Sequence, residues 1–587
     1  MLSERFVFKK NNDEGAICTG PDDLYNEHRA YGFVTQKNMP SEDALTVPDL
    51  CNNFTVPSYF GAEDITSVKQ DENGCYVDSE EVCKRTGCET GRLVPLYFRF
   101  RVPRVGNYLV TLTLYGSGEV LVFAATRRLV FKGELTPGKP NVISFVQNVI
   151  EIIPRGRTMI HERRTIDVTI LGAHATLSGM QIKQVNCPTL YICGDSTVTD
   201  QSADIPYAPG TSYSGWGQML PVHFTTDIAV SNHAHSGLTT ESFRTEGHYS
   251  VIQSHIRPGD YIMFQFAHND QKLPHLKAYE GYWKKLGEYI REAHRSGAHP
   301  IIVTPLARNT WKADGSGYND LLDEYARACL EIGAKYCVPV IDLHGFSMAE
   351  ILRDGLEASK KYYFPKDYTH TNDYGAYKMA GFIADEIKKL NTESTANPYA
   401  RLGGFIKKNT SPWTVDEIPV VPEVPEKYRS SEIPENRNDQ LFSDLERPDD
   451  MLKRAEALDM VIKTAHFFPT NVFNDLYEDI VGHEWYAGAV QCAYQNAIIP
   501  KDMVKDGRFR PEENVTTEDF VCFLMNSYRS RKGLPSIVDN PLEKQCSDYS
   551  TELVGAALAL KLIDKNEDIK NTLTRKRAAD MCRALNL

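Results

Sequence analysis

The chain has 587 residues and a formal net charge of −13 at pH 7. A chain of this length predicts about three or four domains, each able to bury a sizeable core. The acidic balance argues against nucleic acid or an anionic membrane surface as a main partner. The sequence has no apolar run of about 18 residues or more, so we expect no segment that spans a bilayer.

Cysteine usage and the first residues bear on where the protein works. The 13 cysteines are an odd number without regular spacing, which favours reduced thiols over a disulfide framework. Cys193 and Cys337 lie within or beside apolar runs, so we expect both to be small core residues. Residues 1–8 lack the basic-then-apolar order of a secretion signal. We therefore expect a cytoplasmic protein; the alternative is a secreted or cell-surface protein whose signal has been removed.

Residues 1–187 form the first predicted unit. Branched and aromatic residues alternate with polar ones in three stretches, at 96–102, 106–115 and 165–171. A two-residue period is typical of half-buried strands, and helical periodicity is absent. We therefore predict a β-sandwich of the jelly-roll type for this unit.

Five short apolar runs follow, each ending in a polar or turn-forming segment. They lie at 189–193, 227–230, 261–266, 300–303 and 338–343. Such runs predict buried strands of an α/β domain, and an open α/β sheet binds ligands at the carboxyl ends of its strands. A helical stretch is expected from about 373 to 390.

The residues that follow these runs could form a catalytic site. A serine hydroxyl such as that of Ser196 needs a base, a group that orients the base, and donors aimed at the developing oxyanion. Asp367 and His370, three residues apart, can face one cleft as orienter and base. The Ser196 N–H, the Gly237 N–H and the Asn269 amide are candidate oxyanion donors.

Each of these residues also has a plainer interpretation. Ser196 could be a turn serine that caps the next segment, and Gly237 an ordinary turn glycine. Most of the candidates come directly after an apolar run, however, and they occur in a consistent order. This arrangement favours the catalytic interpretation.

Four sequence blocks carry a family resemblance. They are Gly-Asp-Ser-Thr at 194–197, Asn-x-Ala-x-x-Gly at 232–237, Phe-x-His-Asn-Asp at 266–270 and Asp-x-x-His-x-x-x-x-Gly-Ala at 367–376. They resemble the blocks of the SGNH (GDSL) hydrolases, and their residues are most similar to those of the rhamnogalacturonan acetylesterase branch. The resemblance covers residues 188–396. Ala267 departs from it, because the family usually has glycine there, but the change removes no donor.

The resemblance has implications for fold and mechanism. It implies a three-layer α/β SGNH hydrolase domain with a parallel five-stranded sheet. It also implies that Ser196, His370 and Asp367 are catalytic, and that Ser196, Gly237 and Asn269 form the oxyanion hole.

The same resemblance implies a function. A serine carbohydrate esterase would remove acetyl groups from pectic, rhamnogalacturonan-type oligo- or polysaccharides through an acyl-enzyme, with the acetylated glycan as its partner. Two alternatives stay open: an SGNH esterase, lipase or thioesterase acting on another acyl substrate, and a non-catalytic glycan-binding or cell-wall-associated protein. We expect no metal and no other cofactor. The candidate histidines are spread over two loops without a recognisable ligand spacing: His233, His235, His268 and His275.

The unit at 1–187 is similar in layout to the galactose-binding-like or carbohydrate-binding jelly rolls found ahead of such domains in multidomain sugar esterases. That similarity implies a domain that holds glycan or caps the cleft. A structural domain without a ligand site is the alternative.

The remaining residues divide into a tether and a helical part. Residues 397–447 are rich in proline and charge, and proline removes backbone donors, so we predict an extended tether. Residues 448–587 have a helical pattern, with three related segments that open amphipathic helices at 452–456, 515–519 and 573–577.

These segments resemble S-layer homology repeats, in which a Thr-Arg-x-Glu element helps to bind secondary cell-wall polymer. The elements are degenerate, because Thr517 replaces the arginine in one and Arg577 the glutamate in another. Repeats of this kind bury a shared core by packing together. We favour scaffolding, or a homo-oligomer formed through this part, over wall attachment.

Overall fold

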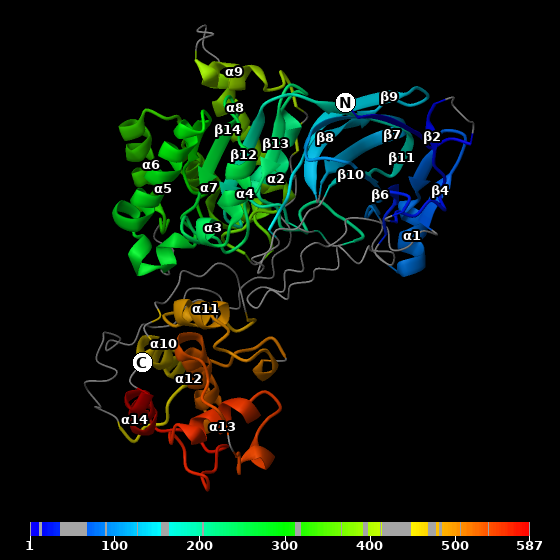
Figure 1. The fold of residues 1–587 in the computed structure, drawn as a ribbon. Coiled ribbons are helices and arrows are strands. Elements are labelled where there is room, and N and C mark those ends of the chain that lie inside the picture. Colours follow the sequence, from blue (N-terminus) through cyan, green and yellow to red (C-terminus); the bar gives the residue numbers. More distant parts are fainter. Residues whose placement is uncertain are drawn as a thin grey trace.

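The structure is a computed structural model, and it contains three groups of elements: N-terminal strands (blue to cyan in Figure 1), a central α/β region (green to yellow-green) and C-terminal helices (yellow to red). The residues that it describes are 2–10, 15–26, 28–35, 67–87, 91–125, 127–153, 164–201, 203, 205–311, 318–365, 367–390, 397–410, 412–413, 448–465, 467, 477–480, 484–504, 506–537 and 539–585.

Five parallel strands form the central sheet, in the order β16-β15-β14-β12-β13. Their bounds are Thr189–Gly194 (β12), Ala229–Asn232 (β13), Tyr261–Gln265 (β14), His299–Val303 (β15) and Val340–Ile341 (β16). Each overlaps one of the five apolar runs, so the prediction of a parallel five-stranded sheet is confirmed. Because β12 is an inner strand, a residue at its carboxyl end lies where such sheets bind ligands.

Consecutive side chains of β12 enter two different cores. Leu190 and Ile192 pack on one face of the sheet, and Tyr191 and Cys193 on the other. Both faces must be apolar because helices cover both. The first core includes residues of α2 (Trp216–Met219), α7 (Leu343–Ser359), α8 (Asp373–Lys389) and α9 (Pro398–Gly404). The second includes residues of α3 (Ser242–Thr245), α4 (His248–His255), α5 (Trp283–Arg295) and α6 (Asp323–Tyr336).

The N-terminal group is built mainly from antiparallel strands, and β7 is its longest. The first part of β7 pairs with β9 and β11, and its last part pairs with β8 and β10. Side chains from both parts pack in one core around a cluster of phenylalanines. The strands are β1 (Ser3–Val7), β2 (Ile17–Cys18), β3 (Tyr31–Phe33), β4 (Val68–Gln70), β5 (Cys75–Val77), β6 (Leu96–Arg101), β7 (Gly106–Ala124), β8 (Arg128–Leu135), β9 (Asn141–Val149), β10 (Thr165–Leu171) and β11 (His174–Val185).

The three predicted alternating stretches correspond to β6, the first part of β7 and β10, while the jelly-roll assignment and a sugar-binding role stay predictions. One helix, α1 (Ser79–Thr86), was missed because it lies in the polar segment that precedes the alternating stretches. Asp78 caps it by accepting a hydrogen bond from the Glu81 N–H at 3.0 Å.

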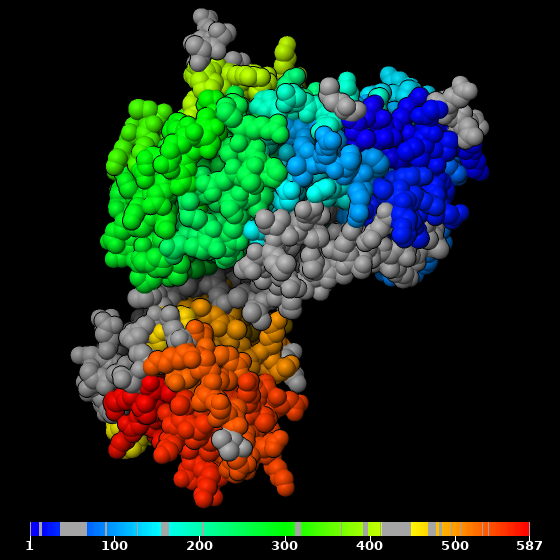
Figure 2. Space-filling view, viewed as in Figure 1, coloured from blue at the N-terminus to red at the C-terminus, as the bar shows by residue number. Residues whose placement is uncertain are grey.

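The N-terminal strands and the central sheet are joined. Gln147 of β9 pairs with Val230 of β13 in parallel, so β9 extends the edge of the central sheet. Leu121, Phe123 and Leu129 of β7 and β8 belong to the same buried core as β12 and α8. The blue-to-cyan and green surfaces accordingly meet directly in Figure 2.

The expectation of reduced thiols holds for ten described cysteines, which are free, but not for Cys83 in α1, which is disulfide-bonded. An odd count without regular spacing does not exclude a single bridge. The expectation that Cys337 is a core residue is wrong. Cys337 is exposed and ends α6 in the left-handed conformation, with φ +53°. Cys193 is a buried free thiol, as predicted.

Among the described residues, the C-terminal group contains the α-helices α10 (Arg454–Thr464), α11 (Ala487–Gln495), α12 (Thr517–Lys532), α13 (Thr551–Ala559) and α14 (Arg575–Leu585). The three related segments each include the start of a helix, α10, α12 or α14, and their backbones form a closed ring. Leu452 N–H donates to Leu573 O (2.8 Å), Leu573 N–H to Val515 O (3.0 Å), and Val515 N–H to Leu452 O (2.8 Å). The weak repeat therefore corresponds to three equivalent positions around one centre, whereas the S-layer homology assignment stays a prediction.

The predicted tether begins too early. Residues 397–413 contain α9, and Leu402 and Trp413 are buried in the core beside the central sheet. The prolines misled the prediction because Pro398 stands at the first position of a helix, where its missing N–H costs no hydrogen bond. Residues 414–447 lie outside the described residues. In the part that the structure describes, no helix is both long and apolar enough to cross a membrane.

Candidate active site

Ser196 lies just beyond the carboxyl end of β12 and is 8% exposed. The preceding Gly194 is required by close packing, because an added Cβ would lie 2.6 Å from Val198 Cγ2 and 2.7 Å from Gln265 O. The chain then turns, with the Val198 N–H donating to Asp195 O at 3.1 Å. This turn places the serine hydroxyl at the edge of the sheet.

The predicted base and its orienter reach that hydroxyl. His370 Nε2 lies 2.7 Å from Ser196 Oγ, and His370 Nδ1 lies 2.8 Å from Asp367 Oδ2. The other carboxylate oxygen, Asp367 Oδ1, accepts the N–H groups of Thr369 (2.7 Å) and His370 (2.9 Å). Since a carboxylate only accepts hydrogen bonds, its contact with His370 assigns the proton to Nδ1 of the imidazole, which leaves Nε2 to accept the serine proton.

The three predicted oxyanion donors come from separate loops. Gly237 has φ +83°, a conformation that glycine adopts without strain. The Asn269 amide donates one N–H to Leu238 O at 3.1 Å, which leaves its second N–H for a ligand. Within the described residues, the backbone N–H groups of Ser196 and Gly237 donate no hydrogen bond.

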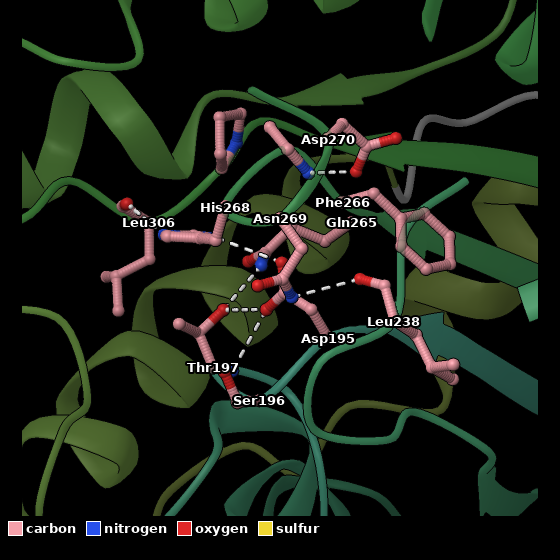
Figure 3. Close-up of polar contacts among 12 residues, drawn as sticks. Asp195, Ser196, Thr197, Leu238, Gln265, Phe266, His268, Asn269, Asp270 and Leu306 are labelled. Carbon is pink, nitrogen blue, oxygen red and sulfur yellow. Dashed lines mark hydrogen bonds and ion pairs between the residues drawn. The ribbon is translucent and has the colours of Figure 1, made fainter. Parts of the chain in front are cut away.

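Two buried side chains, Asp195 and His268, contact each other beneath the Ser196 turn and the Asn269 loop (Figure 3). Asp195 Oδ1 accepts the N–H (3.0 Å) and the hydroxyl (2.8 Å) of Thr197, and Asp195 Oδ2 lies 3.0 Å from His268 Nδ1. His268 Nε2 lies 2.9 Å from Leu306 O. Burial alone would raise the pKa of Asp195, but its contact with His268 holds that pKa below the ordinary value. Asp195 therefore ties the serine turn to the loop that carries Asn269.

Three of the four histidines considered as metal ligands contact other groups. His233 Nε2 lies 2.9 Å from Ser231 Oγ, and burial lowers the pKa of His233 to about 3. His275 pairs with Glu241 at 2.8 Å, and His268 is held as described above. Within the described residues, no group of three or more histidine, cysteine, aspartate or glutamate side chains could hold a metal ion.

Comparison with known proteins places this arrangement in a family. Residues 192–377 match the GDSL-like lipase/acylhydrolase family. The chain is 34% identical over 215 residues to the rhamnogalacturonan acetylesterase RhgT of Bacillus subtilis (strain 168), covering 34% of this chain and 90% of that relative. The chain belongs to the GDSL-like lipase/acylhydrolase family. It is therefore an esterase, and the relatives by name support an SGNH carbohydrate esterase.

Two further relatives come from the same organism. The esterase is 35% identical over 214 residues to the probable rhamnogalacturonan acetylesterase YesY, covering 35% of this chain and 95% of that one. The crystal structure of the protein YXIM is 21% identical, with a TM-score of 0.35, and covers 67% of this chain and 99% of that chain. The acetylesterase relatives thus extend over about a third of the esterase, and the flanking regions lie beyond them.

Tyr213 is a site residue that the sequence did not reveal. Its ring stacks on Phe364, with 3.7 Å between centroids, and meets His370 edge-on at 5.6 Å. Burial first, and then the charge of Asp367 and a hydrogen bond to it, raise the pKa of Tyr213 well above its ordinary value. The hydroxyl therefore stays neutral in the esterase and donates to the carboxylate. Its distance of more than 150 positions from that carboxylate hid the contact from motif spacing.

The loop after β14 contains a second missed residue and a strained one. Lys272 Nζ donates to Asn269 Oδ1 at 3.0 Å, which fixes the amide with its N–H groups pointing away. Asp270 accepts the N–H groups of Thr240 (2.9 Å) and Ala267 (3.2 Å), so it holds the loop. Ala267 has φ +126°, in the region that glycine favours, at the position where the family usually has glycine.

Proposed function

We propose that this esterase removes acetyl groups from pectic, rhamnogalacturonan-type oligo- or polysaccharides through an acyl-enzyme. The observation that carries the proposal is the hydrogen-bonded line from Asp367 through His370 to Ser196. This line supplies the nucleophile, the base and the orienter that ester hydrolysis by a serine requires.

The proposed reaction has two halves. His370 Nε2 takes the proton of Ser196 Oγ as that oxygen attacks the acetyl carbonyl, and Asp367 stabilises the imidazolium that forms. The carbonyl oxygen becomes an oxyanion that accepts from the N–H groups of Ser196 and Gly237 and from the Asn269 amide. The C–O bond to the sugar then breaks, and the sugar oxygen leaves with the proton from His370.

The second half repeats these steps with water. His370 takes a proton from a water molecule, and the resulting hydroxyl adds to the acyl-enzyme carbonyl. The bond to Ser196 Oγ breaks, the serine recovers its proton from His370, and acetate leaves.

The substrate proposal rests on the named relatives, RhgT and YesY, and the location of the protein bears on it. In the cytoplasm, imported oligosaccharides would be the accessible substrates rather than polymer. Ten described cysteines are free thiols and Cys83 is disulfide-bonded. Free thiols are typical of the cytoplasm, so we keep a cytoplasmic protein as the proposal and a secreted one as the alternative.

For the flanking regions we propose the roles that their sequence resemblances imply. The N-terminal strands would form a jelly-roll domain that holds glycan or serves only as structure. The C-terminal helices would act as a scaffold, or as the contact of a homo-oligomer, rather than as a wall anchor.

The decisive variant is Ser196→Ala, assayed by acetate release from acetylated rhamnogalacturonan oligosaccharides. We expect turnover to fall by about 10⁴-fold or more, because the nucleophile is lost. Ser212→Ala is the matched control: Ser212 is also buried, and among the described residues its hydroxyl has no partner. Its turnover should stay within about twofold of wild type.

A panel of esters separates the alternatives. Acetylated xylan oligosaccharides, 4-nitrophenyl octanoate and an acyl thioester would be tested beside the pectic substrate. Faster turnover of one of these would replace the pectic proposal while keeping the serine mechanism. Wild-type turnover by Ser196→Ala, or sugar binding without hydrolysis by the unmodified protein, would remove the catalytic assignment.

A further inference from the structure

The turn between β7 and β8, in the N-terminal strands, reaches the catalytic loops. Arg127 lies in this turn and Arg128 is the first residue of β8. Both are followed by Leu129, which is buried in the core shared with the central sheet. The Arg127 carbonyl accepts a hydrogen bond from Gln218 Nε2 of α2 at 2.7 Å. This hairpin is therefore anchored in the catalytic region by both its backbone and its apolar side chains.

Arg127 is fully buried, and its guanidinium contacts three separate segments of the catalytic region. Nε donates to Gln201 O (3.0 Å), Nη2 donates to Tyr213 O, and Nη1 donates to Asp373 Oδ1 (2.8 Å). The Asp373 side chain is fully buried as well. A planar fork that fills three acceptors fixes their relative positions.

Two of these acceptors lead directly to the base. Tyr213 lies edge-on against His370 and forms a hydrogen bond with Asp367. Asp373 is the first residue of α8, which begins three positions after His370. Arg127 is thus linked to His370 in two ways, through Tyr213 and through the start of α8, and it contacts no reacting atom.

Arg128 contacts residues next to the proposed oxyanion hole. Its Nε donates to Asp200 Oδ2 (2.7 Å) and its Nη2 to Asn232 O (2.8 Å). The Asn232 side chain joins the same group, since Nδ2 donates to Asp200 Oδ1 (2.9 Å) and Oδ1 accepts the Ala234 N–H (3.1 Å). Asn232 opens the block that ends at Gly237, so Arg128 couples the serine loop to the loop of that donor.

We propose that Arg127 and Arg128 are positioning residues of the esterase, Arg127 for the Asp367–His370 pair and Arg128 for the Gly237 loop. The N-terminal strands then supply part of the active site instead of serving only as a neighbouring module. The proposal rests on the proposed serine mechanism, but it does not depend on which glycan is the substrate.

The test uses full-length Arg127→Met, Arg127→Lys and Arg128→Met, with 4-nitrophenyl acetate as the probe. Arg99→Met is the matched control, because Arg99 is equally buried and pairs with Asp167 (2.6 Å) inside the N-terminal strands. We expect Arg127→Met and Arg128→Met to lower kcat about tenfold or more at nearly unchanged KM, since small displacements of catalytic groups are costly. Arg127→Lys should be intermediate, and Arg99→Met should lower the melting temperature but keep kcat within about twofold.

A pH profile separates positioning from loss of stability. Tyr213→Phe keeps the packed ring but removes the donor to Asp367, so the carboxylate would hold the imidazolium more strongly. The acid limb of kcat/KM should therefore move to higher pH in Tyr213→Phe and in Arg127→Lys, even if Arg127→Met fails to fold. Arginine variants whose kcat and pH profile match those of Arg99→Met would overturn the proposal. A wild-type protein that hydrolyses the probe but no acetylated glycan would instead count against the proposed substrate.

Discussion

The two regions that flank the catalytic sheet relate to it in opposite ways. The N-terminal strands share a buried core with it, extend its edge at Val230 and send two arginines into its loops. The C-terminal helices have a core of their own, drawn from described residues between 452 and 585 alone. The sequence alone does not reveal this difference, because both regions have the pattern of separate units on either side of the esterase domain.

The need to cover the β13 edge of the central sheet gives a physical reason why the N-terminal strands are joined to it. An uncovered strand leaves a row of backbone groups free to pair with another chain, and proteins cover such edges. Here β9 lies beside β13 and covers that edge. At the opposite edge, β16 has only two residues, so little backbone is left to cover.

Two deletions would test the comparison most strongly. Removing residues 1–187 strips three almost fully buried side chains, Leu121, Phe123 and Leu129, from the core beside β12. At about 1.5–3 kcal/mol each, their loss alone is comparable to the whole stability of many domains. We expect this shortened protein to be unfolded and inactive, as judged by circular dichroism and ester turnover.

Removing residues 448–587 takes away Tyr494 of α11, an electrostatic neighbour of Tyr213, but the catalytic core keeps all of its described apolar partners. We therefore expect turnover to stay within about twofold of wild type. Equal damage from the two deletions would show that the C-terminal helices are also needed for the catalytic fold. In the calorimeter we expect the full-length protein to melt in two transitions, and the shortened one to lose one of them.

Arg454→Met probes the C-terminal region by itself. Arg454 pairs with Asp519, and Arg575 pairs with Glu456 at 2.9 Å, so two ion pairs link the three related segments. A third pair would join the segments at 515–519 and 573–577, but the corresponding positions hold Thr517 and Arg577, which cannot form an ion pair with each other. Because the Arg454 side chain is only 9% exposed, its loss should destabilise this region by about 3 kcal/mol.

Only the C-terminal melting transition should move, and ester turnover should not. The control is Arg508→Met, since the exposed pair of Arg508 with Glu478 contributes at most about 1 kcal/mol. A change in turnover for Arg454→Met would mean that the two regions are coupled.

The contrast also explains what the sequence could and could not predict. The parallel strands, and the line from Ser196 to Asp367, follow from local signals: apolar runs, turn residues and short blocks. Contacts such as those of Arg127 and Tyr213 join segments far apart in the chain, and no local pattern marks them. The helix at Pro398 was missed because proline signals a helix start as readily as a tether.

The smallest predicted effect is a change in melting temperature on substitution of Ala267. It would also show which of the two melting transitions contains the active site. A non-glycine residue at φ +126° costs about 1–3 kcal/mol, and glycine gives back up to about 1 kcal/mol through its freer unfolded chain. Ala267→Gly should therefore stabilise the protein by about 1 kcal/mol and raise the melting temperature by about 2 °C. Ala293→Gly, equally buried but inside α5, should lower it, because glycine disfavours a helix interior. If the N-terminal strands and the central sheet form one cooperative unit, both variants will shift the transition that disappears when residues 1–187 are deleted. A shift in the C-terminal transition would contradict that view.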